Sequence, residues 1–389
     1  MYNIKTINNI SQKGLSRLPS GNYLVDPDTE NPDAIILRSQ KLHDMEIAEN
    51  LLAVGRAGAG TNNVPVERLT QAGVVVFNAP GANANAVKEL VIAGMLLACR
   101  NLCQAWEYAA NVEGSDEEQA KAVEAGKKQY VGYELPGRTL GVVGLGAIGV
   151  KVANAAVALG MRVIGFDPTI TVKSAWKLSS SVEEMASVDE LIAQADFITF
   201  HVPLINATKN LLSAPRLAEM KTAAVVLNFS RQGIVNDDDI LVAIEEGKIG
   251  AYVCDFPAQK LKNNPRVITL PHLGASTVEA EENCAIMIAD QLKDFLENGN
   301  IRNSVNFPAV KLTRGGKARI AITHKNMPDM IAKISSSVGD AGFNIHHLRN
   351  DSRNDIAYTL MDIECEVDHD MIDQIKDIEG VLKARIVQA

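Results

Sequence analysis

The sequence predicts an α/β protein with two Rossmann-like, doubly wound parallel-sheet domains and a smaller C-terminal module. Short apolar runs alternate with helical stretches through most of the chain, which is typical of parallel sheets wrapped by helices. The last 72 residues change to a βαββαβ order, which indicates a ferredoxin-like α+β module. At 389 residues the chain also exceeds what one hydrophobic core usually supports.

The first alternating region holds three apolar runs, each ending in glycine, proline or polar residues. We expect strands over 34–39, 51–58 and 74–80. From 86 to 103 the sequence is apolar with few breakers, which predicts a long buried helix leading out of this domain. The acidic stretch 111–126 is expected to be a solvated helix or connector.

The second alternating region predicts six strands, over 139–144, 162–168, 197–203, 224–230, 250–256 and 266–272. An apolar helix over 277–296 then leads back to the first domain, which is therefore discontinuous. The expected domains are 1–99 with 277–306, then 100–276, then a polar linker containing Pro308 over 307–317, and the module over 318–389.

Composition excludes several classes of protein. With 47% hydrophobic and 22% charged residues and a net charge of -9, the chain is neither disordered nor a basic nucleic-acid binder. It has no signal-peptide pattern and no run of about 18 apolar residues, so we expect a soluble, cytoplasmic protein. Five cysteines without a CxxC pair favour reduced thiols over a disulfide framework or a metal site.

A glycine loop marks the start of the second alternating region. Gly144, Gly146 and Gly149 follow a predicted strand and open a helix, and Asp167 closes the next strand. The three glycines suit a tight turn, a close approach to a pyrophosphate, and close packing of helix on strand. A carboxylate at Asp167 accepts hydrogen bonds from ribose hydroxyls and repels a 2′-phosphate, so the pattern predicts NAD over NADP.

Polar residues stand at the carboxyl ends of the later strands, where ligands bind in open α/β sheets. These residues are His201, Arg231, Asp255 and His272. Arg231 offers a planar fork to a carboxylate. His272, with an ordinary pKa of about 6.5, suits proton transfer to and from a hydroxyl.

Two loops of small residues lie in the first domain. Residues 55–63 surround Arg56 and suit a cradle for an anion, formed by backbone amides and one guanidinium. A second loop over 81–90 enters a helix with Lys88 in its first turn.

Together these residues resemble the D-2-hydroxyacid dehydrogenases, and within that family the phosphoglycerate dehydrogenases, over essentially the whole chain. The motifs that carry the resemblance are GRAGAGTNNV, FNAPGANANAVKELV, GRTLGVVGLGAIG, HVPL with TKNLL, NFSRQGIVND and LPHLGASTVEAEEN. The resemblance implies NAD-dependent oxidation of D-3-phosphoglycerate to 3-phosphohydroxypyruvate, the first step of L-serine biosynthesis, by a homodimer or homotetramer.

The resemblance also implies roles for individual residues. Arg231 would bind the substrate carboxylate or its 2-oxygen, His272 would take the hydroxyl proton, and Asp255 would contact the nicotinamide. The implied cofactor contacts further include Gly144, Gly146, Ala147, Ile148, Gly149, Asp167, His201 and Pro203. The implied substrate contacts are Arg56, Ala57, Gly58, Asn83 and Lys88.

One departure from the family lies after Asp255. The family places a glutamate about five residues later, where it hydrogen-bonds the catalytic histidine and stabilises its protonated form. Gln259 or Lys260 occupies that place here, depending on a one-residue gap. Gln259 would orient the ring without stabilising imidazolium, and Lys260 would oppose it. We expect an active enzyme whose His272 titrates lower than in relatives, and an upward shift in Gln259→Glu.

The C-terminal module, with HKNMPDMIAKI and GFNI, resembles ACT domains, which bind amino acids in related enzymes. His324, Asn326 and Asn344 match positions that bind serine there. Asp329 replaces the glycine that usually follows Pro328, so the resemblance leaves open either serine binding or a purely structural or dimerising role.

Two other functions remain open at this point. One is a dehydrogenase for another small 2-hydroxy acid, such as glyoxylate or hydroxypyruvate. The other is an NAD-sensing protein whose catalytic residues have decayed, which the missing glutamate favours and the retained Arg231 and His272 disfavour.

Overall fold

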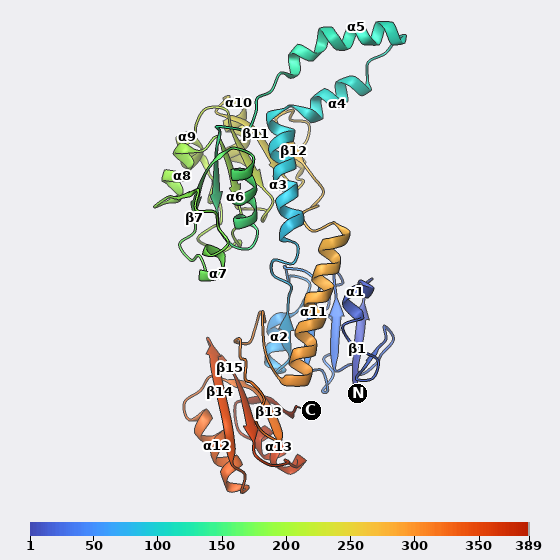
Figure 1. Ribbon diagram of the computed structural model, residues 1–389, viewed down its shortest axis with the longest axis vertical. Coiled ribbons are helices and arrows are strands. Elements are labelled where there is room, and N and C mark those ends of the chain that lie inside the picture. Colours follow the sequence, from blue (N-terminus) through green and yellow to red (C-terminus); the bar gives the residue numbers. More distant parts are fainter. Residues whose placement is uncertain (388–389) are drawn as a thin grey trace. The chain divides into compact units, whose positions relative to one another are not determined.

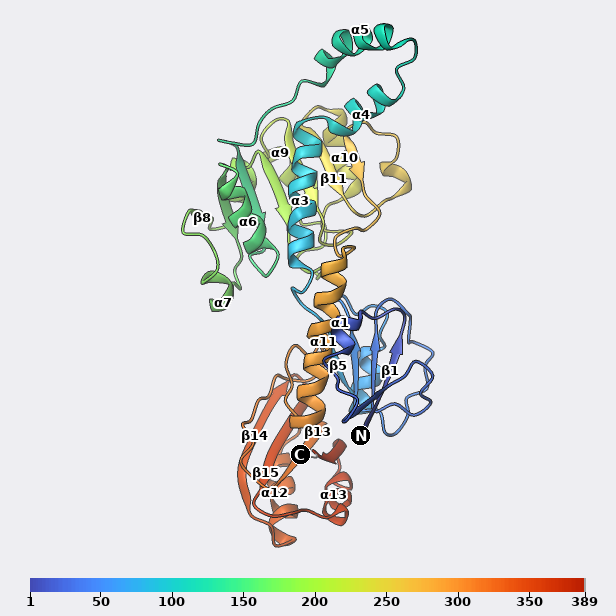
Figure 2. The same cartoon turned by 45° about the vertical axis from the view of Figure 1, so that its right-hand side comes forward.

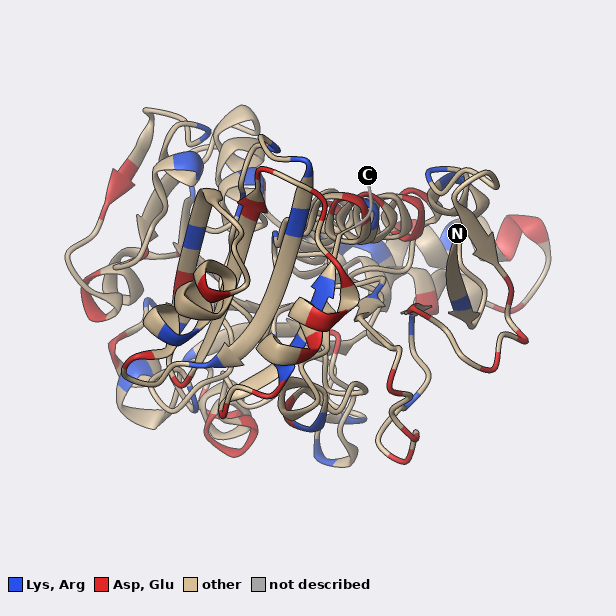
Figure 3. Ribbon diagram, turned by 90° about the horizontal axis from the view of Figure 1, so that it is seen from below, with Lys and Arg blue, Asp and Glu red and all other residues tan. Residues whose placement is uncertain are grey.

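The computed structural model describes residues 1–387, and the chain divides into two compact units (Figure 1). The first unit comprises Met1–Asn83 and the chain from Val278 onward, and the second comprises Ala84–Thr277. Lys and Arg residues are interspersed with Asp and Glu residues along the ribbon (Figure 3). Within residues 1–387 no helix combines the length and apolar character that crossing a bilayer requires.

The first unit is built on a five-stranded parallel sheet of order β2-β1-β3-β4-β5. Its strands are β1 (Tyr2–Ile7), β2 (Tyr23–Val25), β3 (Ala34–Leu37), β4 (Ala53–Arg56) and β5 (Val75–Phe77), with helices α1 (Gln12–Leu15), α2 (Val66–Gln71) and α11 (Val278–Asn298). The three predicted strands are confirmed as β3, β4 and β5. The sequence analysis missed β1 and β2, because β1 buries little of its length and β2 has only three residues.

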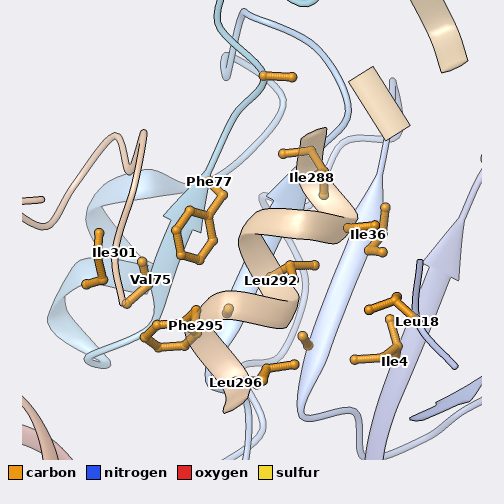
Figure 4. Close-up of a cluster of buried hydrophobic side chains, with 14 of the residues drawn as sticks. Ile4, Leu18, Ile36, Val75, Phe77, Ile288, Leu292, Phe295, Leu296 and Ile301 are labelled. Carbon is orange, nitrogen blue, oxygen red and sulfur yellow. The ribbon is translucent and has the colours of Figure 1, made fainter. Parts of the chain in front are cut away.

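Helix α11 supplies one side of the hydrophobic core of this sheet. Its Ile288, Leu292 and Phe295 pack with Phe77 of β5 (Figure 4). A Cβ placed on Gly55 of β4 would lie 2.4 Å from Ile288 Cγ2, so only glycine allows this close approach of helix and strand.

The second unit holds a seven-stranded parallel sheet of order β12-β11-β10-β9-β6-β7-β8, the doubly wound topology that was predicted. Its strands are β6 (Thr139–Val143), β7 (Arg162–Phe166), β8 (Val182–Glu184), β9 (Phe197–Phe200), β10 (Ala224–Asn228), β11 (Ile249–Cys254) and β12 (Val267–Thr269). All six predicted strands are present. The short, mostly exposed edge strand β8 was missed.

The helices of the second unit are α3 (Ala84–Cys99), α4 (Leu102–Ala110), α5 (Asp116–Gly126), α6 (Gly149–Ala158), α7 (Val172–Ala175), α8 (Val188–Gln194), α9 (Ala214–Glu219) and α10 (Asp237–Glu245), with 3₁₀ turns η1 (Lys127–Tyr130) and η2 (Gln259–Leu261). The long helix predicted over 86–103 ends at Cys99, because Asn101 adopts φ +50 before α4 begins. Helix α3 packs in the core of this unit, whereas the sequence analysis placed it in the first domain.

The C-terminal module has the predicted βαββαβ order, with an antiparallel sheet of order β14-β15-β13-β16 (Figure 2). Its elements are β13 (Ala318–Lys325), α12 (Met330–Asp340), β14 (Ile345–Arg353), β15 (Ile356–Ile363), α13 (His369–Lys376) and β16 (Val381–Ile386). Both helices pack against the sheet over one apolar core. The last strand was expected over 382–388, and its final residue, Gln388, lies outside the described residues.

The module shares a core with the rest of the first unit. Tyr358, Leu360 and Val387 are buried in the same apolar cluster as Leu292 and Phe295 of α11. The segment predicted as a polar linker is also partly buried, since Phe307 and Val310 are inaccessible to solvent and Ile301 bridges to Val310.

Residues of the module and of the segment before it also complete the C-terminal end of α11. The last four carbonyls of a helix have no partner within the helix. Here the Arg385 guanidinium donates to the carbonyls of Phe295 and Leu296, Arg314 donates to that of Glu297, and Arg319 donates to that of Asn298. The Tyr358 hydroxyl donates to the next carbonyl, that of Gly299. The Tyr2 hydroxyl of β1 also donates to the Leu296 carbonyl, at 2.8 Å. The helix end is therefore completed mainly by residues that follow it in the chain.

A fully buried ion pair lies at the same place. Arg319 and Asp362 are both inaccessible to solvent, and the guanidinium donates to the two carboxylate oxygens at 2.6 and 2.8 Å. The second carboxylate oxygen also accepts from the backbone N–H of Gly315 at 2.8 Å. This bidentate geometry, with further hydrogen bonds, is what a buried ion pair requires to offset its loss of hydration.

Lys383 of β16 connects the module to the segment before β4. Its ammonium donates to the backbone carbonyls of Glu49 and Leu51, both at 2.7 Å. Burial lowers the pKa of Lys383 from 10.5 to about 8, with Glu49 opposing and Lys376 adding to the shift.

We expect Lys383→Met to remove a pH-dependent contribution to stability. As pH rises from about 8 to about 10.5, folded Lys383 loses its proton before unfolded Lys383 does, so its contribution to stability increases with pH. The free energy of unfolding of wild type, measured in urea relative to the variant, should therefore rise across this window. A difference that does not vary with pH would contradict the assignment.

Candidate active site

The glycine loop has the geometry that a dinucleotide pyrophosphate requires. Gly144 adopts φ +92, and a Cβ there would lie 2.6 Å from the His201 carbonyl oxygen. A Cβ on Gly149 would lie 1.9 Å from the Gly144 carbonyl oxygen, whereas the Cβ position of Gly146 is open. The open backbone at Gly146, just before the N-terminus of α6, therefore fits a phosphate.

Asp167 is fixed beside this loop. One carboxylate oxygen accepts from the backbone N–H of Leu145 at 2.8 Å, and the other accepts from the N–H of Thr169 at 2.9 Å. The acid that follows β7 is thus held against the glycine loop, in the position expected of a ribose-binding carboxylate. Ala147 and Ile148 form the turn between Gly146 and α6.

Arg231, Asp255 and His272 follow β10, β11 and β12, which are neighbours in the sheet. The structure thus brings together three of the four strand-end residues that the sequence analysis selected. The backbone N–H of His272 donates to the Asp255 carbonyl oxygen at 3.1 Å, which ties the two loops to each other. The side chains of Arg231 and His272 are exposed, and the Asp255 side chain is buried between their loops.

His272 has an uncommon backbone conformation. Its φ is +52, a left-handed value that Asn, Asp and His adopt more readily than other non-glycine residues. The Phe256 ring meets the imidazole edge to face, with centroids 5.3 Å apart. The aromatic contact orients the ring, and the backbone hydrogen bond to Asp255 fixes the loop that carries it.

Asp255 is a buried carboxylate, with 1% of its surface exposed. One oxygen accepts from the backbone N–H of Gly274 at 3.3 Å, and the other has no hydrogen-bond partner among residues 1–387. Burial raises the pKa of Asp255, while positive charge on His272, the Gly274 N–H and positive charge on Arg231 oppose that rise. The carboxylate is therefore electrostatically coupled to both neighbouring cationic groups.

Neither candidate for the missing glutamate contacts the histidine. Gln259 is exposed in η2, and no hydrogen bond from its side chain occurs within residues 1–387. Lys260 donates to Asp238 at 2.8 Å, so its charge is paired with a carboxylate. The structure therefore corrects the expectations that Gln259 orients the ring and that Lys260 opposes its protonation.

The loop that carries Arg231 is supported by a residue that the sequence analysis did not select. Asn228, 1% exposed at the end of β10, donates from Nδ2 to the Arg231 carbonyl oxygen at 3.0 Å. Ser230 donates to the Val202 carbonyl oxygen at 2.6 Å. A buried amide at the end of an otherwise apolar strand was the signal that could have identified Asn228.

His201 differs chemically from His272. Its Nε2 lies 3.1 Å from Thr199 Oγ1, and burial lowers the pKa of His201 to about 3. It is therefore neutral at ordinary pH and unsuited to proton transfer. Its backbone packs on Gly144 and so shapes the edge of the glycine loop, whereas the Pro203 carbonyl accepts from Thr208.

The first unit carries most of the residues predicted to bind the substrate. Arg56 ends β4 and its guanidinium folds over Gly58, where a Cβ would lie 1.5 Å from Nη1. The backbone N–H of Ala57 donates to the Leu37 carbonyl at 2.7 Å, and Asn83 Oδ1 is buried without a partner among residues 1–387. We call residues 55–63 the anion loop.

Arg38 and Lys88 each bond to a neighbouring side chain. Arg38, directly after β3, pairs with Glu281 of α11 at 2.6 Å, and both arginines, Arg38 and Arg56, act electrostatically on the Cys284 thiol. The sequence analysis did not select Arg38, although it stands at the end of a predicted strand of the first domain in the same way as the selected residues of the second domain. Lys88 lies on α3 in the second unit and donates to Asn85 at 2.8 Å, so the two units each hold part of the predicted set.

The residues predicted to bind an effector divide into buried and exposed. His324 is 1% exposed; its Nδ1 lies 2.8 Å from the Lys325 carbonyl, and its Nε2 lies 2.9 Å from Thr359 Oγ1. Its ring is therefore engaged inside the module. Asn326 and Asn344 are exposed. Asp329 adopts φ +68, which explains why glycine suits that position.

Residues 92–274 match the family model described as D-isomer specific 2-hydroxyacid dehydrogenase, NAD binding domain. The chain is 36% identical over 324 residues to D-3-phosphoglycerate dehydrogenase of Methanocaldococcus jannaschii. The match covers 81% of this chain and 59% of the relative, so the chain spans less than two thirds of the relative's length. It is 32% identical over 360 residues to the Haemophilus influenzae protein of the same name, covering 88% and 83%.

Solved structures share the fold. An NAD+-bound 3-phosphoglycerate dehydrogenase of Entamoeba histolytica superposes with a TM-score of 0.61 at 24% identity, covering 78% of this chain and 98% of that one. D-mandelate dehydrogenase of Rhodotorula graminis gives 0.66 at 22% identity, covering 80% and 98%.

Proposed function

Because the chain belongs to the D-isomer specific 2-hydroxyacid dehydrogenases, we propose that it oxidises D-3-phosphoglycerate to 3-phosphohydroxypyruvate with NAD as the electron acceptor. The observation that carries the proposal is the group Arg231, Asp255 and His272 at adjacent strand ends, in the unit that holds the glycine loop. The curated relatives that bear the phosphoglycerate dehydrogenase name support this substrate over other 2-hydroxy acids.

In this proposal each side chain has one task. Arg231 pairs with the substrate carboxylate through its planar fork and orients C2. An imidazole nitrogen of His272 removes the proton from the C2 hydroxyl and thereby holds a positive charge that buried Asp255 stabilises. NAD, held by the glycine loop and Asp167, supplies the hydride acceptor.

We assign the anionic end of the substrate to the first unit. Arg56 and the backbone amides of the anion loop offer donors to a phosphate, as nests of this kind do elsewhere. Met1–Asn83 with α11 then forms the substrate-binding domain, and Ala84–Thr277 forms the NAD domain.

We expect Gln259→Glu to leave the pH profile of kcat/KM nearly unchanged and Asp255→Asn to move it to lower pH. A carboxylate at exposed position 259 would be screened by solvent, whereas the Asp255 carboxylate is buried and coupled to His272. The profiles of wild type and the two variants would be compared with saturating NAD. A large upward shift of the pH profile in Gln259→Glu would contradict this expectation and show that a glutamate at this position acts on His272.

The proposal is tested by NADH formation with 3-phosphoglycerate, compared with glyoxylate plus NADH and with hydroxypyruvate plus NADH. Preferred turnover of 3-phosphoglycerate supports it. Faster turnover of another 2-hydroxy acid would show that the proposed substrate is wrong and that the proposed dehydrogenase reaction is right. Tight NAD binding without turnover of any of these would point to a sensor.

We further propose that the C-terminal module is an ACT-like domain that binds L-serine as a feedback effector. Its βαββαβ topology and the exposed Asn326 and Asn344 support this, with buried His324 supporting the sheet rather than touching the ligand. Millimolar L-serine should lower turnover of wild type, and Asn344→Ala should weaken that effect. Equal inhibition of both proteins would remove Asn344 from the site.

A further inference from the structure

The side chain of Gln291 occupies an unusual place in helix α11. Only 6% of its surface is exposed, although α11 otherwise buries apolar side chains. Its Nε2 donates to the backbone carbonyl of Asn78 at 3.1 Å, and its Oε1 is buried without a partner among residues 1–387. Burying an amide costs free energy unless it is hydrogen-bonded. The hydrogen bond to Asn78 therefore offsets part of the cost of burying Gln291 and links α11 to the segment after β5.

Asn78 carries the connection from α11 to the anion loop. It follows β5, and its Nδ2 donates to the Ala59 carbonyl at 2.7 Å. The N–H of the next residue, Ala79, donates to the Gly58 carbonyl at 2.9 Å. Residues 78 and 79 therefore hold two successive carbonyls of the anion loop, and Gln291 holds the carbonyl of Asn78.

This connection ends at Arg56. The guanidinium lies over Gly58, so the position of that backbone sets the position of the charge. Helix α11 also touches β4 one residue earlier, where Ile288 packs against Gly55. Strand and loop on either side of Arg56 are thus both fixed by one face of α11.

We propose that Gln291 is a positioning residue, which through Asn78 holds the anion loop and thereby places the Arg56 guanidinium for the phosphate of the substrate. This inference rests on the proposed function for its substrate, but not for its geometry. Because the residue acts through Arg56, its effect is confined to substrates that carry the phosphate.

The test compares Gln291→Met, which keeps the volume and removes the donor, with wild type. KM for 3-phosphoglycerate should rise about three- to tenfold with kcat nearly unchanged, as expected for loss of one hydrogen bond that fixes a binding loop. For D-glycerate, which lacks the phosphate, kcat/KM should change by less than about twofold. Hydrogen exchange at residues 57–59 should become faster.

Two further variants protect the interpretation. Ile4→Val, in β1 of the same core, is a matched control that should leave exchange in the anion loop unchanged. Asn78→Ala removes the next link and should reproduce Gln291→Met, and it carries the test if the first variant does not fold.

Equal effects on both substrates, or unchanged exchange in the anion loop, would overturn the inference. Absence of 3-phosphoglycerate turnover in wild type would instead defeat the proposed function. The exchange measurement would still decide whether Gln291 holds the loop.

Discussion

Replacing Arg319 by methionine is expected to lower the free energy of unfolding by about 3–5 kcal/mol, because it leaves Asp362 buried without its partner. Both side chains are inaccessible to solvent and bonded at two points. The change also removes donors from the carbonyls of Asn298 and Leu312. Urea unfolding followed by far-UV circular dichroism measures the loss.

The pH dependence of the same variant gives a second check. Burial alone would raise the pKa of Asp362, but the hydrogen bonds from Arg319 and Gly315 outweigh it and hold that pKa below its ordinary value. The pair therefore contributes stability above the ordinary carboxyl pKa and loses it as pH falls through the folded value.

The deficit of Arg319→Met should consequently shrink in acid. The double variant Arg319→Met/Asp362→Leu, which buries no charge, should recover most of the loss. A single variant within about 1 kcal/mol of wild type would show that the pair contributes little.

Replacing His272 by asparagine is expected to lower kcat about a thousandfold, within the range that a general base contributes. Asparagine accepts the φ of +52 at this position at least as well as histidine does. The loop should therefore keep its shape while the proton acceptor is lost. NADH formation at saturating substrate measures the effect.

NAD binding, followed by quenching of intrinsic fluorescence, should be unchanged in His272→Asn. His272→Ala serves as the comparison, since alanine disfavours the left-handed conformation and adds a structural cost to the chemical one. If His272→Asn retained more than about a tenth of the wild-type turnover, another group would have to accept the proton.

The sequence predicted the parts of the molecule in which local pattern and fold agree. The glycine loop and the strand-end residues Arg231, Asp255 and His272 were found because parallel strands place their carboxyl ends at one edge. Strand β1 was missed because only one of its residues is fully buried, and edge strand β2 was missed because three residues carry little apolar alternation.

Contacts between distant segments were beyond such reasoning. Gln291 and Asn78 are 213 residues apart, and nothing near either residue marks the other as its partner. Gln259 was selected by its position after Asp255, but it lies exposed in a 3₁₀ turn and makes no hydrogen bond to His272. The assignment of α3 failed for a similar reason, since an apolar helix packs equally well on either of two sheets.

The completion of α11 by later residues has a consequence for biosynthesis. The NAD domain, Ala84–Thr277, is contiguous and is synthesised completely before α11. The carbonyls of Glu297 and Asn298 at the end of α11 instead find their side-chain partners only after Arg314 and Arg319 have been made. We therefore expect the NAD domain to fold before the first unit, whose N-terminal segment packs against α11.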